Sequence, residues 1–132
     1  MGNRCVITNK EKTRAIYQHW NGGLDSILPL LSVAKGLDKG FDGLVELSTK
    51  VFNGEEVSID EADFDNGDNG TYVIDDNFEI VAREFFDGKE QSSYSSAEME
   101  VFIRLTNTLG KGNEVDKVME IVRPFLKANV MR

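Results

Sequence analysis

Strand-like and helix-like hydrophobic patterns occupy separate blocks of this 132-residue chain, and their order constrains the fold more than any other feature. Residues 4–9, 15–20, 57–59, 72–74 and 78–82 have the β-branched or alternating apolar character of strands. Apolar residues recur at helical spacing over residues 25–37, 43–52, 95–109 and 113–126. Such segregation is typical of α+β domains. We therefore predict one α+β domain over residues 1–132, in the order ββααβββαα. Its single, mostly antiparallel sheet would have about five strands, with helices packed on a face.

Acidic side chains are concentrated in the middle of the chain. Between Val51 and Ala82 there is no Lys or Arg, but there are ten carboxylates, at positions 55, 56, 60, 61, 63, 65, 68, 75, 76 and 79. The whole chain carries a net charge of −8 and has a pI near 4.6. This balance argues against a protein that coats nucleic acid or an anionic membrane, and it favours a basic partner.

The counts of cysteine and histidine exclude several kinds of site. One Cys excludes an internal disulfide, and one His excludes the usual zinc centres with several histidines. Cys5 and His19 fall on strands predicted to pair, which would allow a thiolate–imidazole couple, but a buried Cys usually only packs. We predict no catalytic residue, metal or cofactor. The first residues lack a secretion signal and the longest apolar run is short, so we expect a cytoplasmic protein without a membrane span.

A glycine-containing turn is the first candidate binding site. His19 and Trp20 end a predicted strand, and Asn21, Gly22 and Gly23 connect it to a predicted helix, in a layout whose free backbone amides can bind an anion. Arg4 on the neighbouring strand could add positive charge. The Walker and GxGxxG patterns are both absent, and a glycine pair of this kind is more often simply a turn.

The second candidate is the run Asp63-Phe64-Asp65-Asn66-Gly67-Asp68-Asn69-Gly70. Closely spaced oxygen ligands suit calcium, but an EF-hand loop starting at Asp65 would place Gly67 where a ligand is required. The two Asn-Gly pairs also favour tight turns, because Asn and Gly tolerate positive φ. The pattern therefore favours turns over a metal site.

Several of these motifs together resemble a family of small, largely uncharacterised proteins. The family is carried by phages, prophages and mobile elements of Gram-positive bacteria. The matching residues are Gly2-Asn3-Arg4 with Val6-Ile7, Ile16-Tyr17 with His19 to Gly23, Asp65 to Gly70 with Tyr72, and Ile80 with Arg83-Glu84. The resemblance implies no catalytic residues. It does imply a setting in which small acidic proteins bind and disable host defence machinery.

From the charge and the resemblance we expect a non-enzymatic, phage-encoded inhibitor of a bacterial defence nuclease, such as a CRISPR effector, in the host cytoplasm. Its carboxylates would take the place of DNA phosphates in the basic DNA-binding channel of the nuclease. The protein itself would not bind nucleic acid. The predicted partner-binding residues are Asp63, Phe64, Asp65, Asp68, Tyr72, Asp75, Asp76 and Glu79. The alternative is a nucleotide-like ligand-binding protein or enzyme that uses Arg4 and the His19–Gly23 turn.

Overall fold

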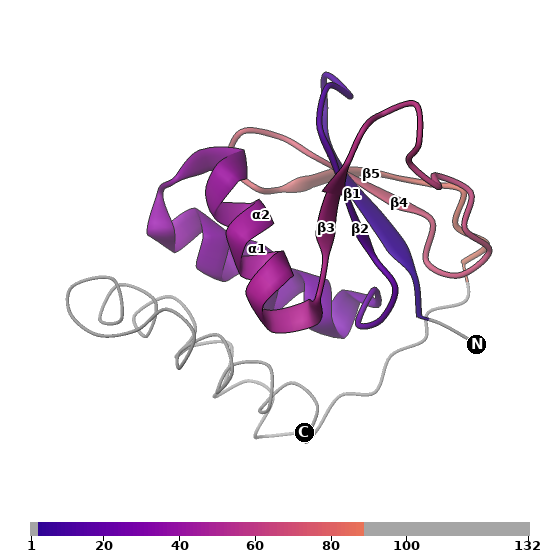
Figure 1. Ribbon diagram of the computed structural model, residues 1–132, viewed down its shortest axis with the longest axis horizontal. Helices are drawn as coiled ribbons and strands as arrows, with labels where there is room; N and C mark the ends of the chain where they lie inside the picture. Colours follow the sequence, from indigo (N-terminus) through magenta and orange to yellow (C-terminus); the bar gives the residue numbers. More distant parts are fainter. Residues whose placement is uncertain (1–2, 89–132) are drawn as a thin grey trace.

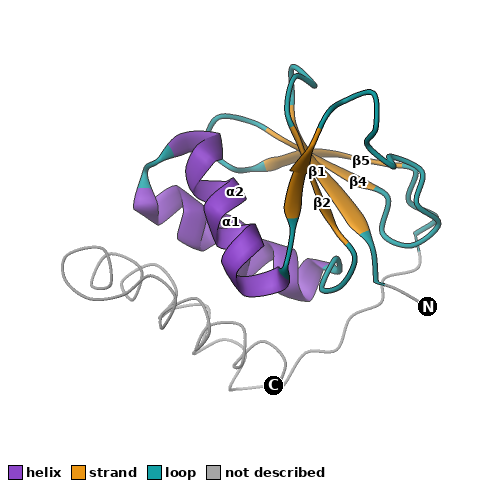
Figure 2. Cartoon of the chain, in the orientation of Figure 1, coloured by secondary structure: helices purple, strands orange, loops and turns teal. Residues whose placement is uncertain are grey.

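The computed structural model describes residues 3–88, apart from the side chain of Asp25. Two helices pack on one face of a single five-stranded sheet (Figures 1 and 2). The elements are β1 (Cys5–Asn9), β2 (Ala15–Gln18), α1 (Leu24–Leu37), α2 (Gly40–Phe52), β3 (Glu55–Val57), β4 (Thr71–Ile74) and β5 (Ile80–Glu84). The α+β class is confirmed. The described order is ββααβββ, whereas the predicted order continued with two more helices, at 95–109 and 113–126, which lie outside the described residues.

The sheet is mixed, so the prediction of a mostly antiparallel sheet was wrong. Its strand order is β3-β2-β1-β4-β5, and the central pair β1–β4 is parallel, with Val6 opposite Thr71 and Asn9 opposite Ile74. Strand β3 runs in the same direction as β1 because each is antiparallel to β2. The connection over residues 58–70 must therefore return to the end of the sheet at which β1 begins, and this crossover makes β4 parallel to β1.

The hydrophobic core lies between the helices and the sheet. Alternate residues of the central strands, including Ile7, Ile16 and Tyr72, are fully buried there against both helices. One polar contact crosses this layer, where the Ser48 hydroxyl of α2 donates to Oε1 of Gln18 over 2.6 Å. This bond fixes the side chain of Gln18, the last residue of β2, against helix α2. The amide nitrogen of the same side chain holds the turn that follows β2.

The other face of the sheet carries the 58–70 connection. In Figure 1 this segment passes on the side of the sheet away from the helices. The Thr71 hydroxyl donates to the carbonyl of Phe64 over 2.9 Å, and Nε of Arg4 contacts Asp68 over 2.7 Å. The described part of the chain therefore has three layers, namely helices, sheet and connection.

Several predicted boundaries were displaced. Strand β2 ends at Gln18, so His19 and Trp20 lie in the following turn and not in the strand. The helices begin at Leu24 and Gly40 rather than near residues 25 and 43, and they end at residues with left-handed backbone conformation, Asp38 and Asn53. Asp and Asn tolerate this conformation better than most side chains, so they close the helices as glycine commonly does.

Candidate functional site

Three of the motifs found in the sequence meet at one corner of the sheet. The backbone of Asn3 donates to the carbonyl of His19 over 3.0 Å and accepts from the amide of Gly22 over 2.8 Å. The next carbonyl, that of Arg4, accepts from both the backbone and the side-chain nitrogen of Asn69, each over 3.0 Å. The start of β1 is thus held between the 19–23 turn and the 66–70 loop, which fixes both relative to the sheet.

The geometry of Gly22 gives the glycine turn a structural role. A Cβ at this position would lie 2.5 Å from the Asn3 carbonyl oxygen, so only glycine fits without displacing backbone. Its amide already donates to Asn3, and Arg4 already bonds Asp68. This geometry does not favour the anion-binding alternative, because two of the donors it required are engaged within the protein.

The side chain of Asn66 organises the loop that was considered as a calcium site. This buried amide donates to the carbonyls of Asp63 and Gly70 over 3.1 and 3.0 Å. Its oxygen accepts from the amides of Asp68 and Gly70 over 3.1 and 3.0 Å. Within residues 3–88, no group of three or more His, Cys, Asp or Glu side chains is placed to hold a metal ion. The hydrogen bonds of the Asn66 side chain therefore connect residues 63, 68 and 70 and hold the loop closed.

The Cys5–His19 couple, which was considered from the sequence but not predicted, is not formed. Cys5 is fully buried in the core on the helix side of the sheet, and burial raises the pKa of its thiol far above the ordinary value. His19 is exposed, with Nδ1 2.8 Å from the hydroxyl of Tyr17. A buried neutral thiol is a poor nucleophile, so this arrangement does not favour covalent catalysis through Cys5.

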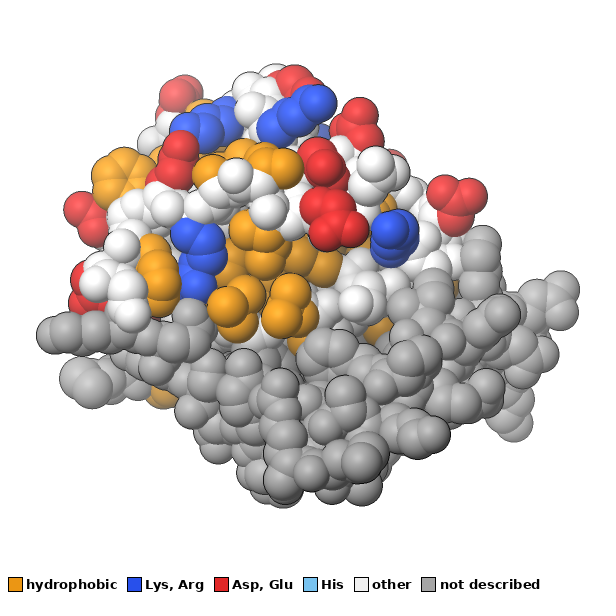
Figure 3. All heavy atoms as spheres, turned by 180° about the vertical axis from the view of Figure 1, so that it is seen from behind, with side chains coloured by type: hydrophobic (Ala, Val, Ile, Leu, Met, Phe, Trp, Pro, Cys, Tyr) orange, Lys and Arg blue, Asp and Glu red, His pale blue; other side chains and the backbone are white. Residues whose placement is uncertain are grey.

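The structure separates the eight predicted partner-binding residues instead of bringing them together. Asp63, Phe64, Asp65 and Asp68 precede β4, whereas Asp75, Asp76 and Glu79 follow it at the other end of the strand. Tyr72 is fully buried, with its hydroxyl bonded to the Gly22 carbonyl over 2.7 Å, so it cannot anchor a partner. On the face shown in Figure 3, acidic and basic side chains alternate around an apolar area, without one continuous acidic patch.

Three of these residues have a partner within the protein. Asp68 accepts from both the backbone nitrogen and Nε of Arg4, and the side-chain hydrogen bond lowers the pKa of its carboxyl. Asp75 accepts from the amides of Asn77 and Glu79, which closes the turn between β4 and β5. Glu79 lies 3.8 Å from Lys35. Counting carboxylates in the sequence could not distinguish these residues from freely exposed ones.

A cleft that was not predicted lies beside the edge strand β3. It has a volume of about 260 Å³ and is lined by Tyr17, Glu55, Val57, Glu61 and Asp63. We call it the acidic cleft. Asp63 had been predicted as a site residue, but Glu55 and Glu61 had not been singled out. Finding them required knowing that Glu55 pairs with Tyr17 across β2 and β3, which the local sequence pattern does not specify.

Five carboxylates of β3 and the connection that follows it are exposed and form no ion pair within the described part of the chain. They are Glu55 of β3 and Asp60, Glu61, Asp63 and Asp65 of the connection, and we call them the β3 acidic surface. The neighbouring Tyr17 has a raised phenol pKa, mainly because of partial burial and further because Asp63 and Asp68 are near. Its hydroxyl therefore stays neutral at physiological pH.

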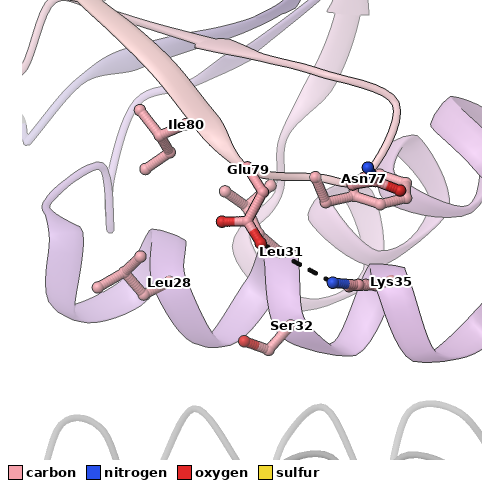
Figure 4. Close-up of a pocket in the computed structure, with 8 residues that line it drawn as sticks. Leu28, Leu31, Ser32, Lys35, Asn77, Glu79 and Ile80 are labelled. Atoms are coloured by element: carbon pink, nitrogen blue, oxygen red, sulfur yellow. Dashed lines mark ion pairs between the residues drawn. The ribbon is translucent and has the colours of Figure 1, made fainter.

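A larger cleft of about 390 Å³ lies between α1 and the β4–β5 turn (Figure 4). Leu28, Leu31 and Ile80 give it apolar walls, and the Lys35–Glu79 pair spans its rim. Opposite charges at the rim offset each other, so this groove has no preference for a partner of either sign.

Neither described helix has the length and apolar character needed to cross a bilayer. Compared with protein-family models, with curated proteins and with solved structures, this chain matches none.

Proposed function

We propose that this protein is a non-enzymatic binding protein whose β3 acidic surface engages a basic, nucleic-acid-binding surface of another protein. The observation that carries the proposal is the set of five exposed carboxylates on one strand edge and its connection, none of them neutralised by an ion pair within residues 3–88. Unpaired surface charge of one sign steers association with a partner of opposite sign and selects against wrong partners.

The proposed mechanism is competition with DNA. Carboxylates held on a strand and a braced connection would occupy the lysines and arginines that otherwise contact phosphates. The resemblance to phage and mobile-element proteins suggests the partner class, a bacterial defence nuclease such as an RNA-guided effector, in the bacterial cytoplasm. The surface differs from the one predicted from sequence. Asp68, Tyr72, Asp75 and Glu79 are engaged within the protein, Phe64 and Asp76 are left out of the proposed surface, and Glu55, Asp60 and Glu61 are added.

The decisive experiment compares two double charge reversals. The test variant is E61K/D63K, which changes the β3 acidic surface. The matched control is E11K/D76K, which changes net charge equally at two other exposed carboxylates. Host proteins captured on the immobilised wild-type chain are identified by mass spectrometry, and the DNA affinity and cleavage activity of each candidate nuclease are then measured with each variant.

We expect the wild type and the control to bind one nuclease and to displace its DNA. We expect the test variant to bind at least about tenfold more weakly, because reversed charges then face like charges. Equal inhibition by the test variant would refute this surface, and a partner without a basic nucleic-acid site would refute the mechanism.

A further inference from the structure

Trp20 presents an exposed aromatic ring from a rigid turn. It is the chain's single tryptophan, and it is 53% exposed. The side chain of Gln18 holds this turn, because its amide nitrogen donates to the carbonyls of Trp20 and Asn21 over 3.4 and 3.1 Å. Gln18 is itself buried and bonded to Ser48. Because these bonds hold the backbone of the turn, less conformational freedom is lost when a partner covers the ring than for a residue on an unsupported loop.

Two further rings connect Trp20 to the acidic cleft. His19 contacts Trp20 edge to face, with ring centroids 5.1 Å apart and planes at 79°. The hydroxyl of Tyr17 lies 2.8 Å from Nδ1 of His19, and Tyr17 also lines the acidic cleft. Tyr17, His19 and Trp20, which we call the aromatic row, therefore extend from the carboxylates of the cleft to the exposed indole.

We propose that the aromatic row and the acidic cleft form one docking surface for an arginine-bearing segment of the partner, with Trp20 as its anchor. This inference rests on the proposed function for the sign of the partner's charge. Trp and Tyr are the residues most often found at energetic centres of interfaces, and the cleft beside them carries Glu55, Glu61 and Asp63. Within the described residues, Arg4 forms its ion pair with Asp68 and not with any of these three carboxylates.

Arginine fits this combination better than lysine does. A guanidinium group stacks flat on an aromatic ring and pairs with a carboxylate through two parallel hydrogen bonds. The protein uses the same contact internally, because Arg14 lies over Phe41 and Arg83 lies over both Tyr72 and Phe86, at 4.8, 4.3 and 3.6 Å from the ring centroids. An incoming arginine would find a ring and unpaired carboxylates side by side.

The test uses a nona-arginine peptide as the probe and the full chain as receptor. Because Trp20 is the single tryptophan, its fluorescence reports binding at this site directly. Calorimetry measures the Trp20→Ala variant, with Val81→Ala as control, since Val81 is an equally exposed apolar residue on the opposite edge strand β5. We expect peptide binding that perturbs Trp20 fluorescence, about fivefold or greater loss with Trp20→Ala, no loss with Val81→Ala, and several-fold weaker binding of nona-lysine.

The outcomes separate this inference from the proposed function. If E61Q/D63N weakens binding and Trp20→Ala does not, the anchor is refuted while the acidic surface stands. If Trp20→Ala weakens binding and E61Q/D63N does not, charge recognition is refuted. If E11Q/D76N weakens binding as much as E61Q/D63N, the peptide binds by bulk charge, and the docking surface is refuted. Stronger binding of an oligothymidine than of the peptide would indicate base stacking on Trp20 and refute a protein partner.

Discussion

Replacing Asn66 by Ala should destabilise the protein strongly, although the residue lies in a loop. The side chain is buried and forms four hydrogen bonds to backbone groups of residues 63, 68 and 70. At roughly 0.5–1.5 kcal/mol net for each bond, and with some water entering the opened loop, we expect a loss of about 2–4 kcal/mol. Urea unfolding monitored by Trp20 fluorescence measures this loss as a lower midpoint with an unchanged slope.

The Asn66→Asp variant sharpens the test. Its carboxylate keeps the acceptor for the two amides but directs negative charge at the carbonyls of Asp63 and Gly70. Folding should therefore raise the pKa of the new carboxyl above its unfolded-state value of about 4. The deficit relative to wild type is then largest above the raised folded-state pKa, and it shrinks as the pH falls through that pKa toward about 4. The exposed neighbour provides the control, Asp65→Asn, which should change stability by less than about 0.5 kcal/mol. A loss below about 1 kcal/mol in Asn66→Ala would refute the bracing role.

Two further substitutions test the corner of the sheet. Gly22→Ala should cost on the order of 2 kcal/mol or more, because its Cβ would lie 2.5 Å from the Asn3 carbonyl oxygen; an unchanged urea midpoint would contradict the packing described there. Asp68→Asn should cost about 1 kcal/mol at neutral pH through the weakened bond to Arg4. Because folding lowers the Asp68 pKa below 3.8, its contribution is present above that pH and is lost as the pH falls through the folded-state pKa. The stability curves of wild type and Asp68→Asn should therefore converge in acid, and a constant difference would exclude an ionic contribution.

Periodicity predicted the described helices and most strands because their burial is a local property of the pattern. The β-branched residues that predict the first two strands include the core residues Ile7 and Ile16, and the helical spacing that turns Leu44 and Leu47 inward is also visible in the sequence. The boundaries shifted where a distant group decides them. Strand β2 stops at Gln18, whose side chain donates to the carbonyls of Trp20 and Asn21 in the following turn and is held in place by Ser48 of α2.

The parallel pairing of β1 with β4 could not be read from local pattern. A buried strand has the same apolar residues whichever way its neighbour runs, and the direction of β4 depends on the path of the 58–70 connection. Asn66 was seen in the sequence as part of a turn, but its four bonds depend on the loop closing on itself. The aromatic row was missed as a unit for a related reason, because His19 and Trp20 were assigned to a strand, where neighbouring side chains point to opposite faces.

Segregation of charge along the chain does not imply segregation in space. Strand pairing and helix packing bring cations from outside the 51–82 segment onto its carboxylates: Arg4 onto Asp68, Arg14 onto Glu56, and Lys35 toward Glu79. Three of the ten acidic residues thereby have a cation as a partner within the protein, and Asp75 is engaged by its own turn. Six of the ten carboxylates therefore remain available for recognition. Five of the six belong to β3 and the connection after it, and the sixth is Asp76. Charge recognition by this protein should therefore depend on position along that edge more than on net charge, which is why the matched charge reversals should differ.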